Sequence, residues 1–155
     1  HRYGNGKARI LGIGIYDKEG QAINAVEQGD RVCIRISVEF QDDLDEPNVG
    51  FMLRNRLGED VTGTNLMFEG MQLPPARAGE RLSVDFVMDL PFLQAGFYYF
   101  SPAVADGLLN QYDVCDWIDN ACAIEIIQRT VTHGHMRIPM RVRATSVSKE
   151  PSGVR

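Results

Sequence analysis

The sequence predicts an all-β protein, an immunoglobulin-like or jelly-roll β-sandwich of two antiparallel sheets with about eight strands. Three observations lead to this prediction. Apolar and polar residues alternate with a period of two along most of the chain. Turn-forming Gly, Asn and Asp interrupt the alternation at short intervals. No long segment has the periodicity of about 3.6 residues that marks an amphipathic helix.

The predicted strands follow one another along the chain, separated by polar or glycine-containing turns. They cover residues 7–16, 31–40, 49–56, 61–65, 82–88, 97–105, 121–129 and 136–143. In the first strand, one face holds Leu11, Ile13 and Ile15, and the other holds Ile10, Gly12 and Gly14. The strand at 31–40 alternates most clearly, and its inward residues are Val32, Ile34, Ile36, Val38 and Phe40. Such alternation is typical of strands with one buried and one solvated face.

The chain has 155 residues, a length typical of one domain. We expect residues 1–147 to form the sandwich and residues 148–155, with Pro151 and Gly153, to form a flexible tail. Because the chain begins at His1, we expect it to be part of a longer protein.

Charge is distributed unevenly along the chain. The net charge of −5 argues against a general nucleic-acid binder. Residues 1–128 carry 10 basic and 20 acidic side chains, whereas residues 129–155 carry 6 basic and 1 acidic. The basic final segment is either a solvated tail or a segment that docks on acidic surface, its own or a partner's.

The three cysteines, Cys33, Cys115 and Cys122, form no CxxC pair. An odd count of unpaired cysteines fits a reducing compartment, where Cys behaves as a small apolar residue. We therefore expect a cytoplasmic protein.

The chain holds none of the motifs of a nucleophile elbow, a zinc protease, a phosphate-binding loop or a dinucleotide-binding fold. His133 and His135 offer only two metal ligands, fewer than zinc requires. The acidic loop at 41–47 lacks the ligand order of an EF-hand. We expect no metal and no cofactor, although 21 acidic residues leave a glycosidase-like carboxylate pair open.

A binding face on the outer side of one sheet is better supported. Strand 49–56 directs Arg54 and Arg56 outward, and strand 97–105 exposes aromatic residues whichever face it turns. Aromatic rings cover the apolar face of a sugar, while Arg, Asp and Glu bind its hydroxyl groups. The predicted carbohydrate-binding residues are Arg54, Arg56, Tyr99, Ser101, Trp117 and Glu125. If strand 97–105 is turned the other way, Tyr98 and Phe100 replace Tyr99 and Ser101.

Several motifs resemble those of one family. They are the opening Arg2-Tyr3-Gly4-Asn5-Gly6, the turn Asp17–Gly20, the segment Gly50–Gly58, Gly63-Thr64-Asn65 and Gly96-Phe97-Tyr98-Tyr99. Over roughly residues 2–145 the chain resembles the C-terminal domain of Wzt-type proteins, the ATP-binding subunits of ABC transporters that export lipopolysaccharide O-antigen.

The resemblance implies a noncatalytic β-sandwich that binds the modified non-reducing end of the O-antigen polysaccharide and so selects finished chains for export. It further implies a homodimer that can exchange its C-terminal strand, here the basic segment with Arg137, Arg141 and Arg143. An upstream ATPase domain would link the chain to the transporter's membrane subunit at the cytoplasmic face of the bacterial inner membrane. Two alternatives remain: a glycan-active enzyme domain, and a structural sandwich for protein–protein contact.

Overall fold

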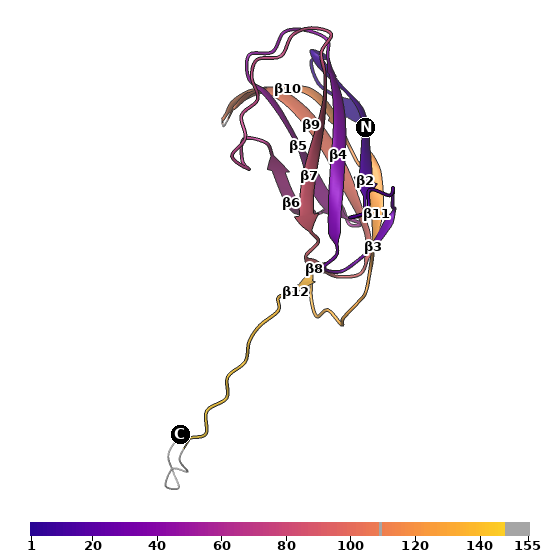
Figure 1. Ribbon diagram of the computed structural model, residues 1–155, viewed down its shortest axis with the longest axis vertical. Helices are drawn as coiled ribbons and strands as arrows, with labels where there is room; N and C mark the ends of the chain where they lie inside the picture. Colours follow the sequence, from indigo (N-terminus) through magenta and orange to yellow (C-terminus); the bar gives the residue numbers. More distant parts are fainter. Residues whose placement is uncertain (109, 148–155) are drawn as a thin grey trace.

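This computed structural model describes residues 1–108 and 110–147. These residues contain twelve β-strands and no helix (Figure 1). The strands are β1 (Arg2–Tyr3), β2 (Ala8–Tyr16), β3 (Ala25–Glu27), β4 (Arg31–Phe40), β5 (Pro47–Asn55), β6 (Asp60–Asn65), β7 (Arg81–Asp89), β8 (Phe92–Leu93), β9 (Gly96–Leu108), β10 (Gln111–Ile118), β11 (Cys122–Ile127) and β12 (Met136–Arg137). The predicted all-β sandwich is confirmed.

The larger layer of the sandwich is a seven-stranded sheet built around β9. Strand β5 pairs with one edge of β9, and β6 continues the sheet beyond β5. Strands β10 and β11 lie end to end along the other edge of β9, and they pair with β1 and β3 respectively. The sheet is antiparallel apart from the pair β3–β11, which is parallel.

The second layer is the three-stranded antiparallel sheet β2–β4–β7. The inward side chains predicted for residues 31–40 are all buried. Three aromatic rings join the layers: Phe51 of β5 packs edge-on against Phe86 of β7 and Phe100 of β9, with centroids 5.2 and 5.3 Å apart. Such contacts between inward faces are how two sheets form one core.

The predicted faces of the first strand are wrong at its start. A β-bulge at Leu11 places one extra residue between the pairs Ile10–Val38 and Gly12–Ser37. Since a single extra residue reverses which face each side chain takes, Ile10 and Ile15 are both buried and Leu11 is exposed. Alternation alone carries no signal for such a bulge.

A buried carboxylate joins the two layers near this bulge. Asp116 on β10 accepts a hydrogen bond from the backbone N–H of Ile10 at 2.8 Å. The Arg2 guanidinium donates to both oxygens of the same carboxylate, at 2.9 and 2.5 Å. Strand β1, which carries Arg2, is thereby held against the end of the sandwich where β2 begins.

The predicted final strand at 136–143 is much shorter in the structure. Only Met136 and Arg137 pair, with Leu93 and Phe92 of β8. The chain beyond Arg137 runs away from the sandwich, and its residues up to 147 are exposed (Figure 1). An alternating segment forms a ladder only where a partner strand is within reach, and β8 is two residues long. The predicted tail at 148–155 lies outside the described residues.

Candidate functional site

The outer face of the seven-stranded sheet carries a groove whose floor follows from strand register. At one level across the sheet the facing residues are Tyr3, Trp117, Ala103, Gly50 and Asn65, from β1 through β10, β9 and β5 to β6. Paired residues project from the same side of a sheet. The row therefore begins with two aromatic rings, crosses two residues with little or no side chain, and ends on an amide.

Neighbouring rows extend this floor along β9 and β5. Ala105 lies between Val114 and Asn48, and Met52 faces Gly63. The groove occupies about 500 Å³, within the range of roughly 300–1,000 Å³ common for small-ligand sites.

Glycine is required at the centre of the floor. A Cβ atom on Gly50 would lie 2.2 Å from the carbonyl oxygen of Thr64, and one on Gly63 would lie 2.9 Å from the Met52 sulfur. The first contact is with backbone, so β5 and β6 pair in this register only because position 50 has no side chain. Close pairing keeps the floor low, which leaves the aromatic rings standing above it.

The aromatic wall depends on the way β1 docks. The Tyr3 and Trp117 rings stack with centroids 6.0 Å apart and planes 23° apart, and Tyr3 is 48% exposed. Gly4 follows with a φ of +146°, and a Cβ atom there would lie 2.2 Å from the Cys115 carbonyl oxygen. Together with the bond from Arg2 to Asp116, this close approach fixes Tyr3 beside Trp117.

A charged network borders the groove beside Trp117. The indole N–H of Trp117 donates to Asp119 at 2.6 Å, and Arg54 donates to Asp119 at 3.2 Å and to Asp60 at 2.8 Å. The Arg54 guanidinium also lies 5.7 Å from the centre of the Trp117 ring. The hydrogen bonds from Trp117 and Arg54 hold the pKa of Asp119 below its usual range. Trp117 is thus oriented by an ionised carboxylate.

The opposite rim is the turn after β6. Phe68, at its tip, is 76% exposed. The side-chain oxygens of Asn48 and Asn65 accept hydrogen bonds from the backbone N–H groups of Met67 and Phe68, at 3.3 and 2.8 Å. Each amide also has an NH₂ group, which can donate two hydrogen bonds. The two asparagines therefore hold the rim and add polar groups to an otherwise apolar lining.

The groove and fold can be set beside known proteins. The family model "Wzt C-terminal domain" matches residues 1–138. This chain belongs to the Wzt C-terminal domain family. The family predicted from the sequence motifs is thereby confirmed.

Structural comparison agrees with this membership. A crystal structure of the C-terminal domain of Wzt matches with a TM-score of 0.85 at 19% identity, over 94% of this chain and 88% of that one. A mutant β-glucosidase from Listeria innocua in complex with laminaribiose matches with a TM-score of only 0.37 at 11% identity, over 74% of this chain and 16% of that one. No curated protein matches.

In this Wzt C-terminal domain, the structure places some of the predicted site residues at the groove. Trp117 forms its wall, and Arg54 orients Trp117. Tyr99 on β9 pairs with Arg54 on β5. This pair is the next outward-facing row along the strands after the row of Met52, which lines the groove. The alternative orientation of strand 97–105 is wrong, because Tyr98 and Phe100 lie in the core.

The structure corrects the prediction that Ser101 contacts the sugar. It projects from the expected face, but it is fully buried and its hydroxyl accepts a hydrogen bond from the backbone N–H of Asn120 at 2.9 Å. The turn after β10 folds over it, so Ser101 supports that turn and is not an accessible sugar contact. Glu125 is exposed on β11, paired with Phe97, on the part of the sheet beyond Tyr99.

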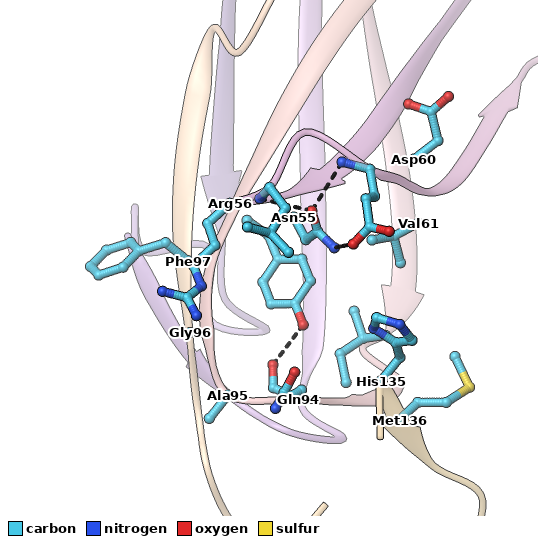
Figure 2. A pocket seen from close by; sticks show the side chains of 14 residues that line it. Asn55, Arg56, Asp60, Val61, Gln94, Ala95, Gly96, Phe97, His135 and Met136 are labelled. Carbon is cyan, nitrogen blue, oxygen red and sulfur yellow. Dashed lines mark hydrogen bonds between the residues drawn. The ribbon is translucent and has the colours of Figure 1, made fainter. Parts of the chain in front are cut away.

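Arg56 lies beyond the end of β5 and lines a different hollow, of about 310 Å³. Figure 2 shows Arg56 and Phe97 on one side of this hollow, and His135 and Met136 on the other. Tyr98 also lines this hollow, and its hydroxyl donates to the carbonyl of Gln94 at 2.6 Å. The six predicted residues therefore share one sheet or its margin but do not form one site.

Several groove residues were not among those predicted, namely Tyr3, Gly50, Met52, Phe68, Ala103 and Ala105. Small residues carry no chemistry by which a sequence could single them out. Tyr3 did have a sequence signal, since the opening Arg-Tyr-Gly-Asn-Gly motif contains it. The motif contributes to the site through the docking of β1.

In the described ranges, no group of three or more His, Cys, Asp or Glu side chains is placed to hold a metal ion. The same residues include no helix long and apolar enough to cross a membrane. Burial raises the pKa of the Cys115 thiol to about 11, as expected of a structural cysteine.

Proposed function

We propose that this domain is a noncatalytic recognition module that binds the modified non-reducing terminus of O-antigen polysaccharide and so selects finished chains for export. Membership of the Wzt C-terminal domain family supports a carbohydrate-binding role in O-antigen transport. The observation that carries the proposal is the stacked pair Tyr3–Trp117 standing beside a floor of Gly50 and Ala103.

The shape of the groove suits a sugar ring. A pyranose has an apolar face of C–H groups that packs on an aromatic ring, and hydroxyl groups around its edge that need hydrogen-bond partners. The aromatic wall offers the first contact, and the amides of Asn48 and Asn65 offer the second. An open groove on one face admits the end of a chain while the rest of the polymer extends into solvent.

Selection then requires only a difference in affinity. A finished terminus fills the groove, whereas an unfinished one leaves polar groups unpaired, at about 1–3 kcal/mol for each buried group. Binding is expected to be weak at one site, because the groove is shallow and the cargo must be released. Two copies in a dimer would raise the effective affinity for a polymer.

The carboxylates beside the groove argue against the enzymatic alternative. A glycosidase needs one protonated carboxyl group as a general acid. Asp60 and Asp119 both bind the Arg54 guanidinium, and the pKa of Asp119 is lowered by its hydrogen bonds from Trp117 and Arg54. Asp119 is thus placed to stay ionised, which suits orientation of Trp117 and does not suit proton donation.

The test is a titration of the domain with O-antigen polysaccharide from the same bacterium, prepared with its natural terminus and with that terminal residue removed. Isothermal titration calorimetry should detect the finished chain and find the trimmed chain at least about tenfold weaker. Equal affinity for both, or binding to neither, would overturn the proposal. Release of sugar during incubation would favour the enzymatic alternative.

We also propose that two copies associate by exchanging the segment after β12. Two features support this. Strand β7 is at the edge of the three-stranded sheet and pairs only with β4 among the described strands. Ile138, Met140 and Val142 alternate with Pro139, Arg141 and Arg143, and they are 61%, 75% and 91% exposed. An unpaired edge and an extended alternating segment can complete each other.

Light scattering of the whole chain tests the exchange. The unchanged protein should have the mass of a dimer, and the double variant Met140→Asp and Val142→Asp should be monomeric because a charge cannot enter the sandwich. A matched control, Val131→Asp, changes an exposed residue before β12 and should remain dimeric. A monomeric parent protein, or a dimeric double variant, would contradict the proposal.

The remaining partners follow from the family. We propose that an ATPase domain precedes this domain in the complete protein and connects it to the transporter's membrane subunit. The domain would then act in the cytoplasm, at the inner face of the bacterial inner membrane, where the finished polysaccharide awaits export.

A further inference from the structure

Both halves of the aromatic wall depend on the position of the first three residues. Tyr3 forms the wall together with Trp117. The carbonyl oxygen of His1 accepts a hydrogen bond from the backbone N–H of Asp119 at 2.8 Å. The carboxylate of Asp119 in turn orients the Trp117 indole. Removing the start of the chain would therefore take away one ring and loosen the support of the other.

The start of the chain is held to the sandwich with little buried apolar surface. Residues 1–7 are all exposed, and the first buried residue is Ala8. Among the described strands, β1 pairs only with β10. Segments with exposed hydrogen bonds and few buried apolar contacts open locally while the rest of a domain stays folded. Residues 1–6, here called the strap, can therefore detach without unfolding the core.

Polar contacts fasten the strap. Arg2 donates to both oxygens of Asp116 and to the carbonyl of Ile10 at 3.1 Å. The backbone N–H groups of Asn5 and Gly6 donate to carbonyl groups of β10 at 3.0 and 2.9 Å. When the strap leaves, Asp116 keeps its bond from Ile10 and gains access to water. Docked and detached states thus differ mainly in hydrogen bonds that water can replace.

The strap has one docked position. Gly4 passes so close to β10 that a Cβ atom there would lie 2.2 Å from the carbonyl oxygen of Cys115. A slip of one residue in either direction would bring the side chain of Tyr3 or Asn5 to this place. The strap therefore cannot slide along β10, and its two states are docked and detached.

We propose that residues 1–6 are a detachable strap that switches the groove between a docked state, which binds the glycan, and a detached state, which releases it. Detachment removes Tyr3 from the wall and separates His1 from Asp119. This inference rests on the proposed function and names how binding at that site is regulated. It places the control at the N-terminal entry to the domain, where the proposed ATPase domain would connect.

Linkage gives the strap a signature in the unchanged chain. A ligand that binds only the docked state stabilises that state. Amide hydrogen exchange of Asn5 and Gly6, measured by NMR in the ¹⁵N-labelled chain, reports detachment, and neither residue lines the groove. O-antigen polysaccharide with its natural terminus, at three times its Kd, should slow this exchange about fourfold. The amide of Gly20, in the turn after β2, should exchange at an unchanged rate.

Two matched pairs of variants detach the strap by different means, and none of the four positions lines the groove. Gly4→Ala adds a carbon that collides with β10. Its control, Gly96→Ala, adds the same carbon at a φ of +139° with no atom within 4 Å. Arg2→Gln removes the ionic contact of the strap. Its control, Arg35→Gln, removes an exposed pair with Asp85 on the second layer.

Both strap variants should keep the circular dichroism spectrum of the folded parent. Exchange at Asn5 and Gly6 should become faster, and the affinity for the polysaccharide should fall at least about fivefold. Fluorescence of Trp117, the single tryptophan of the chain, should shift to longer wavelength. The loss of affinity should match the docked fraction obtained from exchange, because only that fraction binds. The two controls should retain the exchange rates and affinity of the parent.

Faster strap exchange with unchanged affinity would overturn the inference and leave the proposed function in place. Weaker binding with unchanged strap exchange would also overturn it, because the substitutions would then act without detachment. If one strap variant does not fold, the other and the unchanged chain decide. If natural and trimmed polysaccharide bind equally and both slow the exchange, terminus selection fails and the strap stands. Absence of any polysaccharide binding overturns both.

Discussion

The Tyr3 ring stacks on the Trp117 indole, with the ring centroids 6.0 Å apart. Beside this stack, Arg2 binds Asp116, which lies 114 positions away in the chain. The stack exists because β1 adds to the edge of β10, with Tyr3 paired to Trp117. The same docking brings Arg2 to a carboxylate that also binds β2. One short strand therefore completes the groove wall and ties it to the core.

Loss of the aromatic wall should weaken glycan binding with little effect on stability. Trp117→Ala should lower the affinity about tenfold, since aromatic contacts of this kind contribute roughly 0.5–1.5 kcal/mol beyond the area they bury. Calorimetric titration measures the change. Phe97→Ala is the control, because Phe97 is an exposed aromatic residue of β9 outside the groove. Equal effects of the two substitutions would show that the wall is not the contact.

Filling the floor should abolish binding by occupying the space of the ligand. Ala103→Leu adds three carbon atoms on the groove side of β9, between Trp117 and Gly50. Ala123→Leu makes the same change on the neighbouring strand β11, at an exposed position. We expect both variants to melt near the parent temperature, and only Ala103→Leu to lose polysaccharide binding. Retained binding by Ala103→Leu would place the site elsewhere.

Removing the buried charge at position 116 should destabilise the sandwich. Asp116→Asn leaves the Arg2 guanidinium without its carboxylate and weakens the bond from Ile10. We expect a loss of about 2–3 kcal/mol in the free energy of unfolding, measured by urea denaturation. Binding should also weaken, because β1 carries Tyr3. Asp85→Asn disrupts an exposed pair with Arg35 and should cost less than about 1 kcal/mol.

Gln28 should control where the chain leaves the sandwich. Its fully buried amide donates to the carbonyl of Leu93 at 2.7 Å and the hydroxyl of Thr132 at 2.9 Å, and it accepts from the backbone N–H groups of Arg129 and Thr130. Gln28→Ala leaves these groups unpaired, at a cost of about 1–3 kcal/mol.

Hydrogen exchange provides the readout for Gln28. Amides of residues 129–137 should exchange faster in Gln28→Ala, while amides of β4 and β9 stay protected. Gln21→Ala is the control, because Gln21 is exposed. Unchanged exchange at 129–137 would mean that the pairing of β12 with β8 is sufficient to hold this segment.

The carboxylate that orients Trp117 should titrate at low pH. Because the folded pKa of Asp119 lies below its unfolded value, of about 3.9, its contribution to stability is present above about pH 4 and is lost as the pH falls through the folded value. Glycan affinity should therefore be flat from pH 8 to about pH 5. The Trp117 indole N–H resonance should shift with a midpoint below that of an unperturbed Asp, and a midpoint at or above the ordinary value would contradict this.

The strands at 31–40, 49–56 and 82–88 were predicted within two residues of β4, β5 and β7. This was possible because a strand with one buried face displays its orientation in its own residues. On β9 the same alternation divided the residues between two faces but left open which face is inward, and the structure places Phe100 in the core. It failed where the cause is not local, at the Leu11 bulge and in the segment after Arg137.

By itself, then, the sequence determined the fold class, the family and the outward placement of Arg54. Only the tertiary structure decided that Tyr3 stands beside Trp117, that Gly50 and Ala103 form an open floor, and that Ser101 is covered. Side-chain direction along a strand repeats every two residues and can be read locally. Which strands become neighbours, and in what register, depends on pairings between residues far apart in the chain, and the groove exists only where those pairings bring its parts together.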